Sequence, residues 1–286
     1  MTAKQFAERI YNKLRHEVLR VRVKRQHWQY GLTREKRTQP VIISLTSFPR
    51  RFPELELCLK SLFNQKMKAD RIILWLGNDA SVEEAEDLKN RYSGYGLEVF
   101  RDGENNYLSH KKYYYVMRDY PDAVVATADD DLIYPPDWLS SMYLSYLEYP
   151  DCISARRALR IEWDEDGNPT PYVSWLGVVQ SKVPSHKFVA TTGAGALFPP
   201  GCLGTEVLNH EVFMSKARTA DDLWIKIMAV LGDVKVVWAG NNMILPTTIN
   251  PHQGEGLANE NVKNGKNDII FRELCGFYHL DKEDFE

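Results

Sequence analysis

The sequence predicts an α/β fold whose central sheet is mostly parallel. Short β-branched, apolar runs at residues 41–45, 71–76 and 123–127 are typical of strands buried on both faces. Segments with apolar residues at helical spacing separate such runs, for example at residues 53–63 and 81–92. Parallel strands need a long crossover, usually a helix, so this alternation indicates βαβ units through the first half of the chain.

Single residues support the ends of these elements. Pro53 suits the first turn of a helix, where its missing N–H leaves no hydrogen bond unmade, and Ser81 is a good N-cap for the second helix. A third strand is predicted at residues 97–100. The segment 107–120 is predicted to be a helix that leads into the fourth strand.

The second half of the chain is less regular. We expect short strands around residues 152–162 and 171–176, joined by a polar turn at residues 164–169. A helix at about residues 220–231 is followed by a late strand at residues 234–238. We expect this half to build a lid and the acceptor side of a single α/β domain rather than a separable second domain.

Charge is distributed unevenly along the 286 residues. The net charge of −3 gives no reason to expect a nucleic-acid partner. Residues 1–40, however, contain 11 Lys/Arg and 3 Asp/Glu, a net charge of +8. Apolar residues at helical spacing predict a helix at residues 4–27, either solvated and packed on the body or lying in a membrane interface. We therefore divide the chain into a basic helical arm, residues 1–38, and one α/β domain, residues 39–286.

The expected compartment is the cytoplasm. No CxxC pair occurs among the cysteines, which fits a reducing compartment: Cys58, Cys152, Cys202 and Cys275. No run approaches the roughly 18 apolar residues that a membrane span needs. Residues 1–13 contain no apolar core of a secretory signal.

Three consecutive carboxylates, Asp129, Asp130 and Asp131, directly follow the fourth predicted strand. In an open parallel sheet, ligands bind beyond the carboxyl ends of the strands. Several like charges there repel one another unless a cation is shared between them, and oxygen ligands suit Mg²⁺ or Mn²⁺. The triplet therefore predicts a metal site, with a solvated acidic turn or helix cap as the alternative.

The segment from Asp129 to Leu139 resembles the DxD region of GT-A-fold glycosyltransferases, in particular bacterial enzymes of capsule and lipopolysaccharide assembly. The similarity extends over about residues 40–250. It implies a Rossmann-like GT-A domain in which Asp129 lies near the ribose and diphosphate of a nucleotide sugar. It also implies that Asp131 binds the metal directly, and that Asp130 either assists through water or points elsewhere.

The same resemblance extends to the first strand and to a lysine. Thr46, Ser47 and Arg50 match the loop that holds uracil and ribose in related enzymes, although Pro49 stands where many relatives have Asn. Lys112 aligns with a lysine close to the nucleotide or diphosphate, and a compact ammonium suits phosphate oxygens. A surface lysine on a helix is the alternative.

Asp221 and Asp222 open the predicted helix at residues 220–231. Carboxylates in the first turn of a helix stabilise it by interacting with the helix dipole, and this would explain the pair without any catalytic role. Inverting GT-A enzymes carry an acidic pair at this point, so the resemblance implies that one carboxylate is the general base. Asp222 is the first choice and Asp221 the alternative. A positioned base is needed because an acceptor hydroxyl is a poor nucleophile.

Two further positions are candidates. Gly193 and Gly195 lie in a segment that lines the donor sugar and acceptor in similar enzymes, although a tight turn at a strand end also explains them. His252, in a polar Gly- and Asn-rich segment, matches a C-terminal histidine that binds metal or diphosphate in several such enzymes. A lone exposed histidine without such a role is the alternative.

The leading hypothesis is an inverting, metal-dependent glycosyltransferase of bacterial surface polysaccharide synthesis. It would move a hexose from a UDP-sugar to a glycan or a polyprenyl-diphosphate-linked acceptor, with the basic arm at the inner face of the cytoplasmic membrane. One alternative is a nucleotidyltransferase, but residues 47–51 lack the Gly-rich phosphate loop that such enzymes show. Another is a non-catalytic carbohydrate-binding protein of the same fold.

Overall fold

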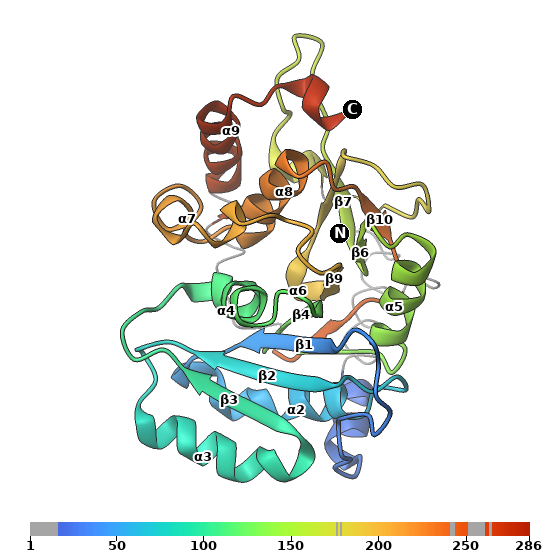
Figure 1. Cartoon of the computed structure of the whole chain (residues 1–286), viewed down its shortest axis with the longest axis vertical. Coiled ribbons are helices and arrows are strands. Elements are labelled where there is room, and N and C mark those ends of the chain that lie inside the picture. Colours follow the sequence, from blue (N-terminus) through green and yellow to red (C-terminus); the bar gives the residue numbers. More distant parts are fainter. Residues whose placement is uncertain (1–16, 176, 178, 241–243, 251–260, 263–264) are drawn as a thin grey trace, which may run out of the picture.

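A seven-stranded sheet, in the order β10-β6-β9-β4-β1-β2-β3, forms the centre of the molecule (Figure 1). The computed structural model describes residues 17–175, 177, 179–240, 244–250, 261–262 and 265–286. The strands are β1 (Val41–Thr46), β2 (Arg71–Leu76), β3 (Leu97–Arg101), β4 (Val124–Asp129), β6 (Ile153–Ala155), β9 (Ala196–Phe198) and β10 (Val236–Trp238). Only β9 runs antiparallel to its neighbours β4 and β6, which confirms the mostly parallel sheet.

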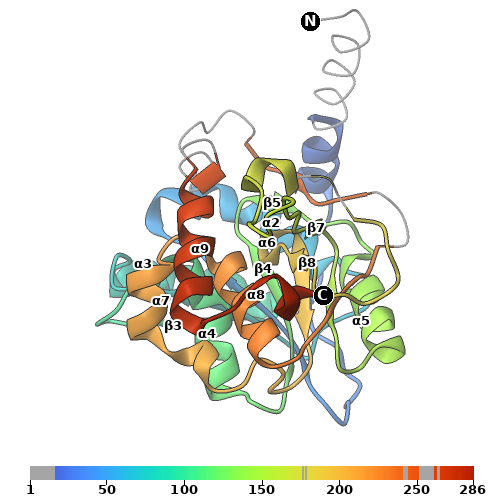
Figure 2. The same ribbon diagram turned by 90° about the horizontal axis from the view of Figure 1, so that it is seen from above.

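Apolar side chains on the two faces of this sheet form two separate cores. In β1, Val41, Ile43 and Leu45 face one core and Ile42 faces the other, the period of two expected of a strand. Helices α2 (Phe52–Phe63), α3 (Val82–Tyr92) and α5 (Trp138–Glu148) contribute to the first core. The second core includes residues of α4 (Lys111–Asp119), α7 (His210–Lys216), α8 (Asp221–Leu231) and α9 (Lys266–Tyr278). Figure 2 shows α9 alongside α8.

Several predicted element ends agree closely with the structure. The four strands of the first half and the helix at residues 220–231 all form. Ser81 begins α3 with a capping box, in which its Oγ accepts from the Glu84 backbone N–H at 3.1 Å. The Glu84 carboxylate accepts in return from the Ser81 backbone N–H at 2.7 Å.

The predicted strand at residues 171–176 is wrong. Tyr172–Trp175 is a 3-10 helix, closed by a hydrogen bond from the Ser174 N–H to the Pro171 carbonyl. The Tyr172 N–H donates to the Asp268 carboxylate on α9, so it is not available to a strand ladder. The segment's aromatic residues pack together on the second core, where Trp175 contacts Phe271.

The helix predicted at residues 107–120 begins later than expected. Leu108–His110 is a 3-10 turn, and the α-helix α4 covers Lys111–Asp119. Leu108 has a φ of +50°, a left-handed conformation that a regular α-helix does not accommodate. This turn precedes Lys112, which α4 holds in the first turn of the helix.

Two small antiparallel ribbons flank the main sheet. β5 (Leu132–Ile133) pairs with β11 (Thr247–Thr248), and β7 (Ala158–Arg160) pairs with β8 (Phe188–Ala190). The first ribbon brings residues of the late chain next to the acidic triplet. A further short helix, α6 (Thr192–Gly195), lies against β4.

The described part of the basic arm packs on the body. Residues 17–25 are helical, and Val23 is buried in the first core. Trp28 stacks on Tyr95 with ring centroids 4.9 Å apart, while the Lys60 ammonium lies 4.9 Å from the Trp28 ring. No helix in the described ranges combines the length and apolar character that a bilayer crossing requires.

Candidate active site

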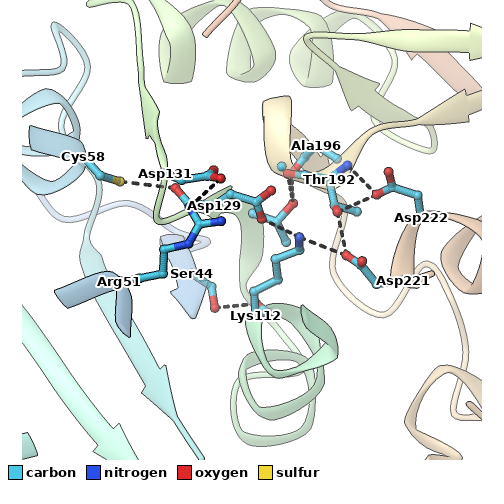
Figure 3. Close-up of polar contacts among 12 residues, drawn as sticks. Ser44, Arg51, Cys58, Lys112, Asp129, Asp131, Thr192, Ala196, Asp221 and Asp222 are labelled. Atoms are coloured by element: carbon cyan, nitrogen blue, oxygen red, sulfur yellow. Dashed lines mark hydrogen bonds and ion pairs between the residues drawn. The ribbon is translucent and has the colours of Figure 1, made fainter. Parts of the chain in front are cut away.

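Four aspartates line one cavity of about 560 Å³. Asp129 ends β4, Asp131 follows it by two residues, and Asp221 and Asp222 open α8 (Figure 3). The two acidic sequence motifs, about ninety residues apart, therefore face the same space. Other residues that line the cavity include Lys112, Arg157, Tyr172, Gly193, Thr219, Thr248, Asn261 and Asn267.

Lys112 joins the two acidic motifs. Its Nζ lies 2.6 Å from Oδ1 of Asp129 and 2.9 Å from Oδ2 of Asp221. Burial alone would lower the pKa of Lys112, but the charges of Asp129 and Asp221 outweigh it and raise this pKa. The lysine is 2% exposed and stays protonated, so it is a fixed cation within the acidic site rather than a surface residue.

Asp221 and Asp222 have different environments. Burial tends to raise the pKa of Asp221, yet Lys112 lowers it well below the ordinary value. Burial raises the pKa of Asp222 to about 6, and the neighbouring charge of Asp221 adds to this rise. Of the two carboxylates, Asp222 has the pKa that suits a general base near neutral pH.

Thr192 orients both carboxylates of α8. Its backbone N–H donates to Oδ1 of Asp222 at 2.9 Å. Its Oγ1 lies 2.6 Å from the same Asp222 oxygen and 2.8 Å from Oδ2 of Asp221. A hydroxyl has one proton but can also accept, so Thr192 can donate to Asp221 while accepting from a protonated Asp222.

Asp131 and Asp130 have separate partners in the loop after β1. Oδ2 of Asp131 accepts from the Arg51 guanidinium at 2.7 Å. Asp130 is buried and accepts from the Ser47 hydroxyl at 2.5 Å, away from the cavity lining. Burial raises the pKa of Asp130 to about 7. Of the triplet, only the outer two carboxylates face the cavity.

The carboxylates Asp129 and Asp131 fit a divalent cation by their chemistry. Two carboxylates with substrate phosphates and water are a common Mg²⁺ or Mn²⁺ set. Each carboxylate already pairs with a basic side chain, Asp129 with Lys112 and Asp131 with Arg51. A metal bound to Asp131 would therefore share this carboxylate with Arg51 or displace the guanidinium. Within the described ranges, no group of three or more His, Cys, Asp or Glu side chains is arranged around one point. His252, the third predicted ligand, lies outside the described residues.

The two candidate glycines make room for protein side chains. A Cβ at Gly193 would lie 1.9 Å from Oδ2 of Asp129, so a larger residue would displace that carboxylate. Gly195 has a φ of +115°, and a Cβ there would lie 2.1 Å from Nε1 of Trp138. Gly193 lines the cavity and Gly195 does not.

The candidate nucleotide loop lies beside the cavity but does not line it. Thr46 pairs with Asp129 across β1 and β4, and its hydroxyl donates to the Trp75 carbonyl at 2.8 Å. Ser47 is turned toward Asp130, and Arg50 is exposed. The aromatic side chains of Trp163 and Trp175 also lie outside the cavity lining and belong to the second core.

Sequence reasoning missed four residues of this site: Arg51, Arg157, Tyr172 and Thr192. Arg157 and Tyr172 come from the irregular second half, where no motif marked them. The Arg157 guanidinium has no hydrogen bond or ion pair within the described part of the chain. Burial raises the pKa of Tyr172, and the nearby charges of Asp222 and Arg157 act on this pKa in opposite directions. Both Arg157 and Tyr172 line the cavity that Asp222 also lines.

A family model decides the class of this protein. The model of glycosyl transferase family 2 matches residues 45–200, more than half of the chain. The chain belongs to glycosyl transferase family 2. Membership in this family favours glycosyl transfer over the nucleotidyltransferase alternative. No curated protein matches the chain.

Solved structures agree with the GT-A fold. A structure of S. aureus TarS residues 1–349 in complex with UDP-GlcNAc matches with a TM-score of 0.51 and 11% identity, over 81% of this chain and 65% of that one. The mannosyltransferase PcManGT from Pyrobaculum calidifontis, in complex with GDP-Man and Mn²⁺, matches with a TM-score of 0.50 and 13% identity. That match covers 85% of this chain and 68% of the mannosyltransferase. The chain thus spans slightly under two thirds of the TarS fragment.

Proposed function

We propose that this glycosyltransferase is an inverting, metal-dependent enzyme that moves a hexose from a UDP-sugar to a glycan or a polyprenyl-diphosphate-linked acceptor in bacterial surface polysaccharide synthesis. The observation that carries the proposal is the pair Asp221 and Asp222. One carboxylate is held by a buried lysine, and the other faces the cavity with a pKa of about 6. The two carboxylates therefore differ in pKa. Asp221 stays ionised beside Lys112, whereas Asp222 can take up a proton near neutral pH.

Asp222 is the proposed general base. As the acceptor oxygen attacks the anomeric carbon, its proton moves to the Asp222 carboxylate, and the bond from that carbon to the diphosphate breaks. Thr192 fixes Oδ1 of Asp222 through two contacts, which leaves Oδ2 for the acceptor. Attack from the side opposite the leaving group inverts the anomeric centre. Asp221 then acts as the anion that pairs with Lys112 rather than as the base.

The donor diphosphate is proposed to lie at the Asp129 and Asp131 end of the cavity. A divalent cation held there by the two carboxylates would neutralise the charge that develops on the leaving diphosphate. Lys112, whose Nζ lies 2.6 Å from Oδ1 of Asp129, contributes a further positive charge. Thr46, Ser47 and Arg50 are proposed to contact the nucleoside from the loop after β1, with Asp130 positioning this loop through Ser47. The absence of a side chain at Gly193 leaves room for the Asp129 carboxylate.

The solved neighbours support a nucleotide-sugar donor with either uracil or guanine. TarS was solved with UDP-GlcNAc and the mannosyltransferase with GDP-Man and Mn²⁺. We favour UDP because metal-dependent enzymes of this fold commonly use it. Calorimetry with UDP and GDP in the presence of Mn²⁺ separates the two. Tighter binding of GDP would replace the donor assignment but not the class of reaction.

Residues 1–38 are proposed to be a basic arm on the catalytic domain, residues 39–286. The net charge of residues 1–40 is positive, with 11 Lys/Arg against 3 Asp/Glu, and would attract the arm to the anionic inner face of a cytoplasmic membrane. This places a cytoplasmic enzyme next to a lipid-linked acceptor. Deletion of residues 1–38 should weaken salt-sensitive binding to anionic liposomes.

Donor hydrolysis tests the enzyme assignment. Release of UDP from UDP-sugars is measured with Mn²⁺, with Mg²⁺ and with EDTA. The proposal expects release that depends on the metal and that falls in Asp131→Asn. An NMR time course of the transfer product reports the anomeric configuration. Retention of the donor's configuration would exclude the inverting mechanism, and full activity in EDTA would exclude the metal.

A further inference from the structure

The helix at residues 17–25 has two different faces. Leu19 and Val23, four residues apart, point inward and pack in the first core. The outward face follows the spacing i, i+3, i+4, i+7 and consists of Val18, Val21, Arg22 and Arg25. The two valines are 67% and 45% exposed although each carries an apolar side chain.

Basic side chains surround these exposed valines. Arg22, Lys24 and Arg25 are all exposed to solvent. The one acidic residue of this helical stretch, Glu17, has its carboxylate 3.5 Å from Arg20. A face that combines exposed apolar side chains with arginines complements an anionic bilayer, in which the apolar groups enter the interface and the cations contact headgroups.

An apolar groove of about 330 Å³ lies between this helix and the body. Val18, Leu19, Arg22, Val23 and Gln26 line it from the helix, so Val18 and Arg22 lie at the edge that the outward face shares with the groove. The segment Ile133–Pro136, together with Ile244 and Leu245, supplies most of the apolar lining from the body, and the polar residues on that side are Ser61, Asn64, Asp137 and Thr247.

The β5–β11 ribbon separates this groove from the catalytic cavity. Ile133 and Thr247, which pair across the ribbon, line the groove. Leu132 and Thr248 pair in the next position and line the catalytic cavity. Side chains alternate between the two faces of a strand, so the ribbon has one face toward each space. Leu245 lines both, and it marks where the two spaces meet.

We propose that the groove holds the hydrocarbon chain of a lipid-linked acceptor while the helix at residues 17–25 rests on the anionic headgroups of its membrane. The acceptor's sugar then reaches the catalytic cavity past Leu245. This assignment rests on the proposed glycosyl transfer, and it selects the lipid-linked acceptor over a soluble glycan. The mostly apolar lining favours a hydrocarbon chain, and the neighbouring arginines favour an anionic bilayer around it.

Vesicle binding tests the membrane contact without any catalysis. The full chain is sedimented with phosphatidylcholine vesicles that contain or lack phosphatidylglycerol. Each basic residue at such a surface contributes about 1 kcal/mol, so Arg22→Gln with Arg25→Gln should lower the partition coefficient by about 30-fold. Val18→Ser with Val21→Ser should also lower it, whereas the control Val183→Ser, at a valine 72% exposed elsewhere, should not. Unchanged binding of the double-valine variant overturns the proposal.

Farnesyl diphosphate and inorganic pyrophosphate test the groove. The proposal expects farnesyl diphosphate to raise the melting temperature well above the effect of pyrophosphate. Ile244→Glu, which places a charge in the groove at a residue 45% exposed, should remove this difference but leave the UDP-induced shift intact. Equal shifts of the melting temperature from the two ligands overturn the proposal. It is also overturned if light scattering shows a dimer and the Val18→Ser, Val21→Ser double variant is a monomer, because the exposed valines would then form a dimer interface. Metal-dependent UDP release is measured in parallel, so a failed glycosyltransferase assignment gives a different result from a failed groove assignment.

Discussion

The Thr192 hydroxyl lies 2.6 Å from Oδ1 of Asp222, and the same oxygen accepts the Thr192 backbone N–H at 2.9 Å. One residue of α6 thus fixes a carboxylate at the start of α8. Since these contacts occupy Oδ1, the base function that we propose rests on Oδ2. This arrangement leads directly to the first two predictions.

Asp222→Asn should lower kcat by about 10²- to 10⁴-fold, the range that removal of a general base commonly gives. Asparagine retains the oxygen that accepts from the Thr192 backbone, so the fold and UDP binding should persist. Steady-state kinetics of UDP release and calorimetry with UDP check the two parts. Asp233→Asn, at a carboxylate 93% exposed, is the matched control. Equal kcat in Asp222→Asn and in the control would remove Asp222 from the mechanism.

The pH dependence of kcat/KM should show a limb near the pKa of Asp222, about 6. A general base acts in its deprotonated form, so the rate should fall as the pH falls through this value. Burial is the main reason for the raised pKa, and Asp221 is the next. Asp221→Asn removes that negative charge and should move the limb to lower pH. A limb that moves upward instead would contradict the proposed coupling between the two carboxylates.

Lys112→Met should destabilise the fold strongly. It leaves the buried carboxylate of Asp221 and the part-exposed carboxylate of Asp129 without the cation that lies within 3 Å of each. Breaking a buried ion pair such as Lys112–Asp221 costs about 3–5 kcal/mol. Urea unfolding followed by circular dichroism measures the change. Lys89→Met, at a surface lysine 54% exposed, should cost no more than about 1 kcal/mol. Similar losses in the two variants would mean that Lys112 has no structural role in the site.

Gly193→Ala should reduce activity more than stability. Its Cβ would lie 1.9 Å from Oδ2 of Asp129, so the carboxylate must move from its position in the cavity. We expect a loss of UDP release with Mn²⁺ of at least about tenfold, since small displacements in an active site are costly. Gly94→Ala is the matched control, because nothing lies within 4 Å of the Cβ it would add. Full activity of Gly193→Ala would show that the position of Asp129 does not matter.

Arg51→Met should tighten the binding of Mn²⁺. The Arg51 guanidinium lies 2.7 Å from Oδ2 of Asp131 and competes with a metal for that carboxylate. Calorimetric titration with Mn²⁺ in the presence of UDP gives the affinity of both proteins. Arg91→Met, at an arginine 60% exposed that pairs with Asp87 on α3, is the control. Weaker Mn²⁺ binding in Arg51→Met would indicate that Asp131 does not bind the metal.

Sequence patterns determined the order of elements and the two acidic motifs. The apolar run before Asp129 predicted β4, and the helical spacing after Asp222 predicted α8. These predictions succeeded because strand and helix periodicity are local properties of the chain. The prediction at residues 171–176 failed because the packing of Tyr172 and Trp175 on the second core, together with the Asp268 contact, overrode local propensity.

The tertiary structure alone decided how these motifs meet. The sequence marked Arg50, but its neighbour Arg51 is the residue that pairs with Asp131, because adjacent side chains of a 3-10 turn point in different directions. Lys112 forms ion pairs with Asp129 and with Asp221, which is about a hundred residues further along the chain. No local sequence pattern can predict a contact between residues so far apart in the sequence. Periodicity therefore determined that carboxylates would lie at the ends of a strand and a helix. Which cations they face, and which of them keeps a raised pKa, depends on burial and distance, and these quantities exist only once the chain has folded.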